Sequence, residues 1–153
     1  MNPQSITTLV HYNFWANDRI LAACAHLSPT DFTRPVTPDP GWGNLRGILV
    51  HVLDAEYGWR TVLQGQDASS IIDAAAFADV AALQTRWMAE RDAWFAYVST
   101  LDDEKIDNDP KVWQTILHVI MHGIQHRAEA AFILTGYEHS PGELDFDVFL
   151  QER

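Results

Sequence analysis

Apolar residues recur at three- and four-residue steps along four long stretches of the chain, which is the spacing of one buried face of an α-helix. These stretches cover about residues 3–27, 44–64, 77–101 and 111–136. Between them lie segments rich in proline, glycine and aspartate, which interrupt helices. No stretch shows the apolar–polar alternation of a half-buried strand. The pattern therefore predicts an all-α fold, a four-helix bundle formed by a single domain over residues 1–153.

The predicted helices carry signals at their ends. Asn44 is a suitable N-cap for the second helix, and Gly65 is suited to stop that helix. Gly136 is expected at the C′ position that follows the fourth helix. A short helix is expected near residues 144–150, whereas "DDEKIDNDP" is expected to break the chain before the fourth helix.

One polar residue, Asn17, falls on the apolar face of the first predicted helix. A buried amide needs hydrogen-bond partners, so we expect Asn17 to tie this helix to a neighbour or a loop. The same face ends at Cys24, the only cysteine of the chain, which we interpret as a small buried hydrophobe rather than a catalytic thiol. The apolar members of the face are Ile6, Val10, Phe14, Leu21 and Cys24.

The charge balance limits the partners of the protein. The formal net charge is −11, and an acidic surface repels phosphate backbones and anionic lipids, so nucleic acid and membranes are poor partners. No signal peptide is visible, and no apolar run approaches the roughly 20 residues that span a bilayer. A single cysteine forms no disulfide within the chain, which suits a reducing compartment. We therefore expect a soluble, cytoplasmic protein.

Histidines interrupt the apolar pattern of the fourth predicted helix. His118, His122 and His126 follow one another at four-residue intervals and form one ridge on that helix. His51 stands in an apolar run of the second helix, "ILVHVL", and a bundle can bring it opposite the ridge. Neighbouring imidazoles suppress one another's protonation and remain available to a cation. The spacing favours a metal site, with a hydrogen-bonded core network as the alternative.

The residues beside the histidines exclude two kinds of metal enzyme. Neither His118 nor His122 is followed by the glutamate that serves as general base in zincins. No histidine has an acidic residue three positions before it, as the di-iron bundles of the ferritin type require. The expected site is therefore mononuclear and rich in histidine, with coordination positions left open for chemistry.

Four segments together resemble the DinB/YfiT-like family: "YNFWANDRIL", "GILVHVLDAEYGW", "HVIMHGIQHRAEA" and the closing "GELDFDVFL". The resemblance covers nearly the whole chain. It implies a bundle of up-down-down-up topology, usually dimeric, that holds one divalent metal through three histidines. The matching positions here are His51, His122 and His126. The resemblance places His118 one turn below the metal, as a packing or supporting residue.

One position departs from the family pattern. The family often continues its last ligand as His-Arg-Gly-Gln, whereas here His126 is followed by Arg127, Ala128 and Glu129. Two interpretations of Glu129 are open. Glu129 pairs with Arg127 or another base at a surface, or it orients a ligand and accepts a proton.

The resemblance also implies a style of chemistry. Family members of known chemistry include transferases and isomerases that use bacillithiol, mycothiol or glutathione, and others are described as metal-dependent hydrolases. By resemblance, then, the protein is a metal-dependent transferase or hydrolase in which the ion activates a low-molecular-weight thiol or water against a small-molecule substrate. The alternative is a non-catalytic metal-binding module that acts in sensing, storage or stress-response interactions.

The remaining expectations concern the surroundings of the site. Three imidazoles accept several divalent transition metals, of which we expect nickel or zinc. The expected wall of the substrate pocket is aromatic: Trp42, Tyr57, Trp59 and Trp113. The large apolar residues of the first and third helices suit either a homodimer interface or a thick core, and the resemblance favours the homodimer.

Overall fold

The computed structural model describes residues 1–152 and confirms the all-α fold. Its four long helices are α1 (Pro3–Cys24), α3 (Leu45–Leu63), α4 (Val80–Val98) and α6 (Lys111–Gly136). Shorter elements lie in the connections and after α6. They are α2 (Pro29–Phe32), the 3₁₀ turn η1 (Ala74–Ala76), α5 (Asp103–Asn108) and α7 (Phe146–Gln151).

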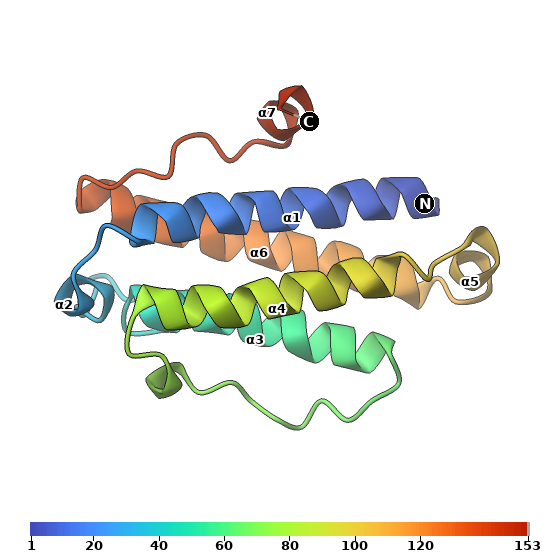
Figure 1. The fold of residues 1–153 in the computed structure, drawn as a ribbon, viewed down its shortest axis with the longest axis horizontal. Helices are drawn as coiled ribbons and strands as arrows, with labels where there is room; N and C mark the ends of the chain where they lie inside the picture. Colours follow the sequence, from blue (N-terminus) through green and yellow to red (C-terminus); the bar gives the residue numbers. More distant parts are fainter. Residues whose placement is uncertain (153) are drawn as a thin grey trace.

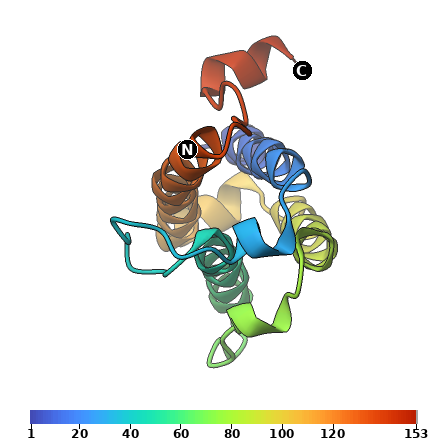
Figure 2. The same ribbon diagram turned by 90° about the vertical axis from the view of Figure 1, so that its left-hand side faces the viewer.

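The long helices form a bundle of up-down-down-up topology, as predicted. Helices α1 and α6 run in one direction, and α3 and α4 run in the other (Figure 1). Each of α4 and α6 packs against both α1 and α3, so the four helices form a square when the bundle is viewed from its end (Figure 2). The long connection after α3 returns to the other end of the bundle, which allows α4 to run parallel to α3.

Side-chain caps explain where three of these helices begin. The side chains of Asn2, Asn44 and Asp79 accept hydrogen bonds from backbone N–H groups in the first turns of α1, α3 and α4. Each cap satisfies a donor that has no partner within the helix. The N-cap predicted at Asn44 is confirmed, and Gly65 ends α3 with a φ of +69°.

The structure corrects three details of the sequence prediction. Gly136 is the last residue of α6 rather than its C′ residue, and Glu138 adopts the left-handed conformation with a φ of +64°. The segment "DDEKIDNDP" forms α5, which Asp102 caps and whose Ile106 is buried. The connection after α1 contains the short helix α2, which Ser28 caps and whose Phe32 is buried. One buried apolar residue in a four- to six-residue helix leaves no periodicity to detect.

The core lies between the four helices and accounts for the predicted apolar face of α1, all of whose members are buried. Trp87 and Trp94 of α4 are also buried within the single chain. Helix α7 covers α1 from outside the bundle, where Phe146 and Phe149 pack against the ring of Tyr12. Over residues 1–152, no helix has the length and apolar character that crossing a membrane requires.

Candidate metal centre

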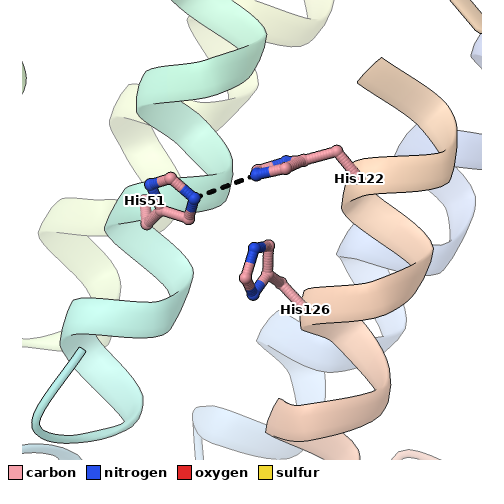
Figure 3. Close-up of side chains that lie close together, drawn as sticks. All are labelled: His51, His122 and His126. Carbon is pink, nitrogen blue, oxygen red and sulfur yellow. Dashed lines mark hydrogen bonds between the residues drawn. The ribbon is translucent and has the colours of Figure 1, made fainter. Parts of the chain in front are cut away.

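Three histidines from two helices converge near the middle of the bundle. His51 projects from α3, and His122 and His126 project from α6, so that the three rings face one another (Figure 3). Their potential ligand nitrogens all lie within 4.8 Å of one another. His122 and His126 are one turn apart on α6, which places both rings on the side of the helix that faces α3.

The spacing of these nitrogens fits a transition-metal ion. Nitrogens about 2.0–2.1 Å from a tetrahedral ion stand roughly 3.3 Å apart. The Nε2 atoms of His51 and His122 are 2.9 Å apart, and the nitrogens of the cluster reach at most 4.8 Å. Small rotations of the rings convert this arrangement into a coordination shell. We call the three residues the histidine triad.

The surroundings of two triad members favour their neutral forms. Burial, together with the neighbouring rings of His126, His51 and His118, lowers the pKa of His122 to about 4. Burial and His126 likewise lower the pKa of His51, against the opposing effects of Asp54 and Glu129. Since only a neutral imidazole has a free lone pair for a cation, His51 and His122 are available to a metal near neutral pH.

Glu129 fixes the ring of one triad histidine. Its Oε2 lies 2.7 Å from Nδ1 of the buried His126, so Nδ1 donates to the carboxylate and Nε2 is left free to bind a metal. Glu129 does not pair with Arg127, whose side chain points into the bundle toward Asn13 and Asn17. The contact therefore agrees with the ligand-orienting interpretation of Glu129.

Trp42 covers the triad from a loop that we call the strap (residues 34–44). The ring of Trp42 stacks on that of His51 with the centroids 3.6 Å apart, and it meets His126 edge-on at 6.0 Å. One carboxylate oxygen of Asp39 accepts the backbone N–H groups of Gly41, Trp42 and Gly43 and so shapes the strap. Of the predicted aromatic wall, Trp42 is the member in contact with the triad.

The strap also requires a glycine on the helix beneath it. A Cβ atom on Gly47 would lie 2.0 Å from the carbonyl oxygen of Trp42, far inside a van der Waals contact. Any larger residue at position 47 would displace the backbone that carries Trp42. The sequence offers no signal for this contact, because position 47 is otherwise an ordinary helical site.

The other residues predicted from the sequence lie outside the triad. His118 is exposed, its ring 6.1 Å from that of His122 and 5.4 Å from Trp59 in an edge-on contact. Tyr57 lies beneath the guanidinium groups of Arg60 and Arg86, and Trp113 packs against the core. His118 therefore lies beside the triad and packs against the ring of Trp59.

Behind the triad lies a buried polar network that we call the Glu56–Arg127 bridge. Glu56 Oε1 accepts hydrogen bonds from the amides of Asn13 (2.6 Å) and Asn17 (2.8 Å). The oxygens of the same two amides accept bonds from Nη1 of Arg127, at 2.7 and 2.8 Å. Two asparagines of α1 thus connect an acid of α3 with a base of α6. The expected tie through Asn17 is confirmed, whereas Glu56 and Arg127 were missed.

The bridge carries two buried ionisable groups. Burial raises the pKa of Glu56 to about 7, although Asn17, Asn13 and Trp87 donate hydrogen bonds to the carboxylate and oppose that shift. Burial also lowers the pKa of Arg127, which the charge of Glu56 opposes. Arg127 directly follows His126, so the bridge anchors the segment of α6 that carries His122 and His126.

The fold and the site define a class: a helical bundle with a cluster of three histidines between two of its helices. Compared with known families, the chain matches the DinB family over residues 1–152 and belongs to it. No curated protein sequence matches the chain at a significant level. Family membership and the geometry of the triad are both compatible with metal binding.

Proposed function

We propose that this protein is a metal-dependent enzyme of the thiol-transferase or hydrolase type. The observation that carries the proposal is the convergence of three imidazoles, from α3 and α6, whose ligand nitrogens lie within 4.8 Å of one another. His51, His122 and His126 would hold one divalent ion, with nickel or zinc as the expected metals. Bound there, such an ion lowers the pKa of a coordinated thiol or water and supplies the nucleophile.

The residues around the triad have defined tasks in this proposal. Glu129 keeps the Nδ1 proton of His126 engaged and so fixes which nitrogen faces the metal. Trp42 lies flat against His51 and shields that side of the centre from water. The Glu56–Arg127 bridge holds α6 in register with α1 and α3. None of these groups supplies a fourth ligand.

The position of His118 supports catalysis over a purely structural ion. A structural zinc site has four protein ligands, whereas a catalytic one has three and keeps a position open for water or substrate. His118 is exposed and faces Trp59, and it is not part of the triad. The non-catalytic metal-binding module remains the competing proposal.

Elemental analysis of untagged, purified protein tests the metal site. We expect about one equivalent of a divalent transition metal in the wild type and little in His122→Ala. The matched control is His118→Ala, which removes an imidazole one turn away on the same helix and should retain the metal. Loss of metal in His118→Ala would instead indicate a closed site with four protein ligands.

Activity assays on the metal-loaded protein separate the two proposals. Thiol transfer can be followed with glutathione and 1-chloro-2,4-dinitrobenzene, and hydrolysis with 4-nitrophenyl acetate. Turnover that disappears in His122→Ala and survives in His118→Ala supports the enzyme. A bound metal without either activity favours the module, and absence of metal after reconstitution with nickel and zinc overturns both.

We also propose that the protein acts on a small molecule as a homodimer and has neither nucleic acid nor a membrane as partner. The acidic net charge of −11 supports the last two points. The homodimer is supported by family membership alone, since Trp87 and Trp94, two of the residues that suggested an interface, are buried within one chain. Sedimentation velocity measures the oligomeric state directly.

A further inference from the structure

A cavity of about 600 Å³ lies between the strap and the C-terminal half of α6. One wall consists of the first half of the strap, from Arg34 to Pro40, and the other of α6 from Ala128 onward. Trp42, Tyr57, Trp59 and Trp113 are not among its lining residues. The apolar side chains that line it are Pro35, Val36, Pro38, Pro40, Phe132 and Ile133.

The cavity and the metal centre are built from the same two elements. The strap contributes its prolines, Pro35, Pro38 and Pro40, to the lining of the cavity, and two residues later Trp42 stacks on His51 of the triad. Helix α6 contributes His126 to the triad and Glu129 to the lining of the cavity. A single carboxylate therefore borders both spaces, because Oε2 of Glu129 bonds to His126 while the residue also faces the cavity.

The distance along α6 suits one small organic molecule. An α-helix rises 1.5 Å per residue, so Phe132 stands about 9 Å beyond His126 and Glu129 about halfway between them. A body of two fused rings with a short arm spans that length. Such a molecule can rest on Phe132 and Ile133 and direct its arm past Glu129 toward the triad.

The charges in the lining select among such molecules. Glu129 brings a carboxylate whose Oε1 is left for a ligand, since Oε2 is engaged by His126. Among residues 1–152, Arg34 is the one base in the lining; it is paired with Asp31, and its guanidinium lies 5.1 Å from the ring centre of Tyr137. The cavity therefore offers an acceptor and no unpaired positive charge, which disfavours an anion.

We propose that this cavity binds the organic substrate, and that the substrate is mainly apolar, neutral or positively charged, with a hydrogen-bond donor directed at Glu129. The assignment of the bound molecule as a substrate rests on the function proposed above, whereas the binding preference rests on the cavity alone. An anionic thiol such as glutathione has no matching group in this lining. Thiol and substrate would then approach the metal from different sides.

Three naphthalene probes of equal body and different charge test the binding preference: 1-naphthylmethylamine, 1-naphthalenemethanol and 1-naphthoate. Dissociation constants are measured by calorimetry on the metal-loaded protein. We expect the amine and the alcohol to bind at least tenfold more tightly than the carboxylate. Equal binding of all three, or tighter binding of the carboxylate, would overturn the proposal.

Variants locate the binding at this cavity. Phe132→Ala should weaken the amine and the alcohol at least fivefold. Met121→Ala is the matched control, since it truncates an exposed apolar residue of α6 that does not line the cavity. Glu129→Gln should remove the preference for the amine over the alcohol and leave binding of the alcohol in place. Indifference of binding to Phe132→Ala would show that the probes bind elsewhere and would contradict the proposal.

The connection to the metal has its own readout. In protein loaded with cobalt(II), the amine should shift the visible absorption bands of the ion, and Phe132→Ala should require more amine for the same shift. Binding without any spectral change would remove the substrate assignment. Calorimetry with the amine on metal-free His122→Ala tests the cavity even if no metal binds to the wild type, so failure of the proposed function and failure of this proposal are distinguishable.

A second copy of the chain is the competing occupant of the cavity. If Phe132→Ala converted a dimer into a monomer in sedimentation velocity and none of the probes bound the wild type, the cavity would be a subunit interface. That outcome would overturn the proposal. Binding of the amine without a change in oligomeric state supports it.

Discussion

Individual residues decide how the triad presents its nitrogens. Two of the three rings have a close partner outside the triad: Trp42 stacks on His51, and Glu129 holds Nδ1 of His126. Groups that orient a ligand from behind contribute to metal affinity without touching the ion. Substitution of Glu129 therefore changes the metal affinity of the site while all three histidines are kept.

Removing the carboxylate of Glu129 should weaken metal binding. We expect Glu129→Ala to raise the dissociation constant for zinc by about 10- to 100-fold, because the ring of His126 loses its partner. Glu129→Gln keeps a neutral acceptor and should cost less than about tenfold. Competition titration against a chelator of known affinity measures both. An unchanged constant in Glu129→Ala would mean that the hydrogen bond does not orient the ligand.

At Gly123, the addition of a single Cβ atom should affect the stability of the fold. A Cβ there would lie 2.6 Å from Nη1 of Arg127 and 2.9 Å from Oδ1 of Asn13, so the side chain that holds the bridge would have to move. We expect Gly123→Ala to destabilise the fold by about 1–3 kcal/mol, as overpacking of a core does. Urea unfolding, followed by circular dichroism, measures the free energy of unfolding.

Gly58 is the matched control for that substitution. It also lies inside a helix, α3, and a Cβ at this position would meet nothing within 4 Å. Gly58→Ala should therefore stabilise the protein by about 0.5–1 kcal/mol, the difference in helix propensity. A destabilising Gly58→Ala, or a neutral Gly123→Ala, would contradict the contacts described for these two glycines.

At the scale of the elements, the Glu56–Arg127 bridge links three helices. Glu56 belongs to α3, Asn13 and Asn17 to α1, and Arg127 to α6. All four side chains are buried, and Trp87 of α4 adds a hydrogen bond to Oε2 of Glu56 at 2.6 Å. Polar groups so deeply buried fix the register of helices because any sliding leaves them without partners.

The raised pKa of Glu56 gives the bridge a pH dependence. The pKa is about 7 in the folded protein and near the ordinary value of 4.5 in the unfolded chain. The folded state thus binds the proton more tightly, so the contribution to stability is complete below about pH 4.5 and is lost as the pH rises through 7. The loss is on the order of 3 kcal/mol, at about 1.4 kcal/mol per unit.

Glu56→Gln isolates this effect, because other groups titrate over the same range. We expect the difference in unfolding free energy between wild type and Glu56→Gln to decrease as the pH rises from 4.5 to 7. The variant should also be less stable than the wild type at low pH, since an amide cannot accept every bond that Glu56 accepts. A difference that stays constant over this range would exclude the shifted carboxyl.

For the whole molecule, a metal bound to the triad would act as a cross-link between α3 and α6. These helices pack against each other, and a metal held by His51 on one side and His122 and His126 on the other would join them. Because the triad does not exist in the unfolded chain, a bound metal stabilises the folded state by mass action. Its effect therefore extends beyond the site to the unfolding of the bundle.

Free zinc or nickel at 100 times its dissociation constant should stabilise the protein by about 2.7 kcal/mol. In thermal unfolding, this appears as a rise in the melting temperature of several degrees, reversed by a chelator. His51→Ala should abolish the rise, and so should His122→Ala, whereas His118→Ala should preserve it. If neither metal changed the melting temperature, the histidines would instead be interpreted as a hydrogen-bonded core network.

Local patterns in the sequence predicted a large part of this molecule. The spacing of apolar residues gave the four long helices, and capping residues gave the start of α3 near the observed residue. The four-residue interval of the histidines on α6 predicted one ridge, and the place of His51 in an apolar run of the second helix indicated its partner. The resemblance then selected His51, His122 and His126 from these four histidines. These features are readable because the period of a helix makes every fourth residue share its surroundings.

Only the tertiary structure decided the rest. The sequence does not indicate that Asn13 and Asn17 connect Glu56 with Arg127. These four side chains come from three helices and become neighbours only when the helices pack. The strap places Trp42 on His51 through backbone bonds to Asp39, and the cavity arises where the strap faces α6. Periodicity reports which face of a helix is buried, whereas the partner of that face depends on distances that folding alone sets.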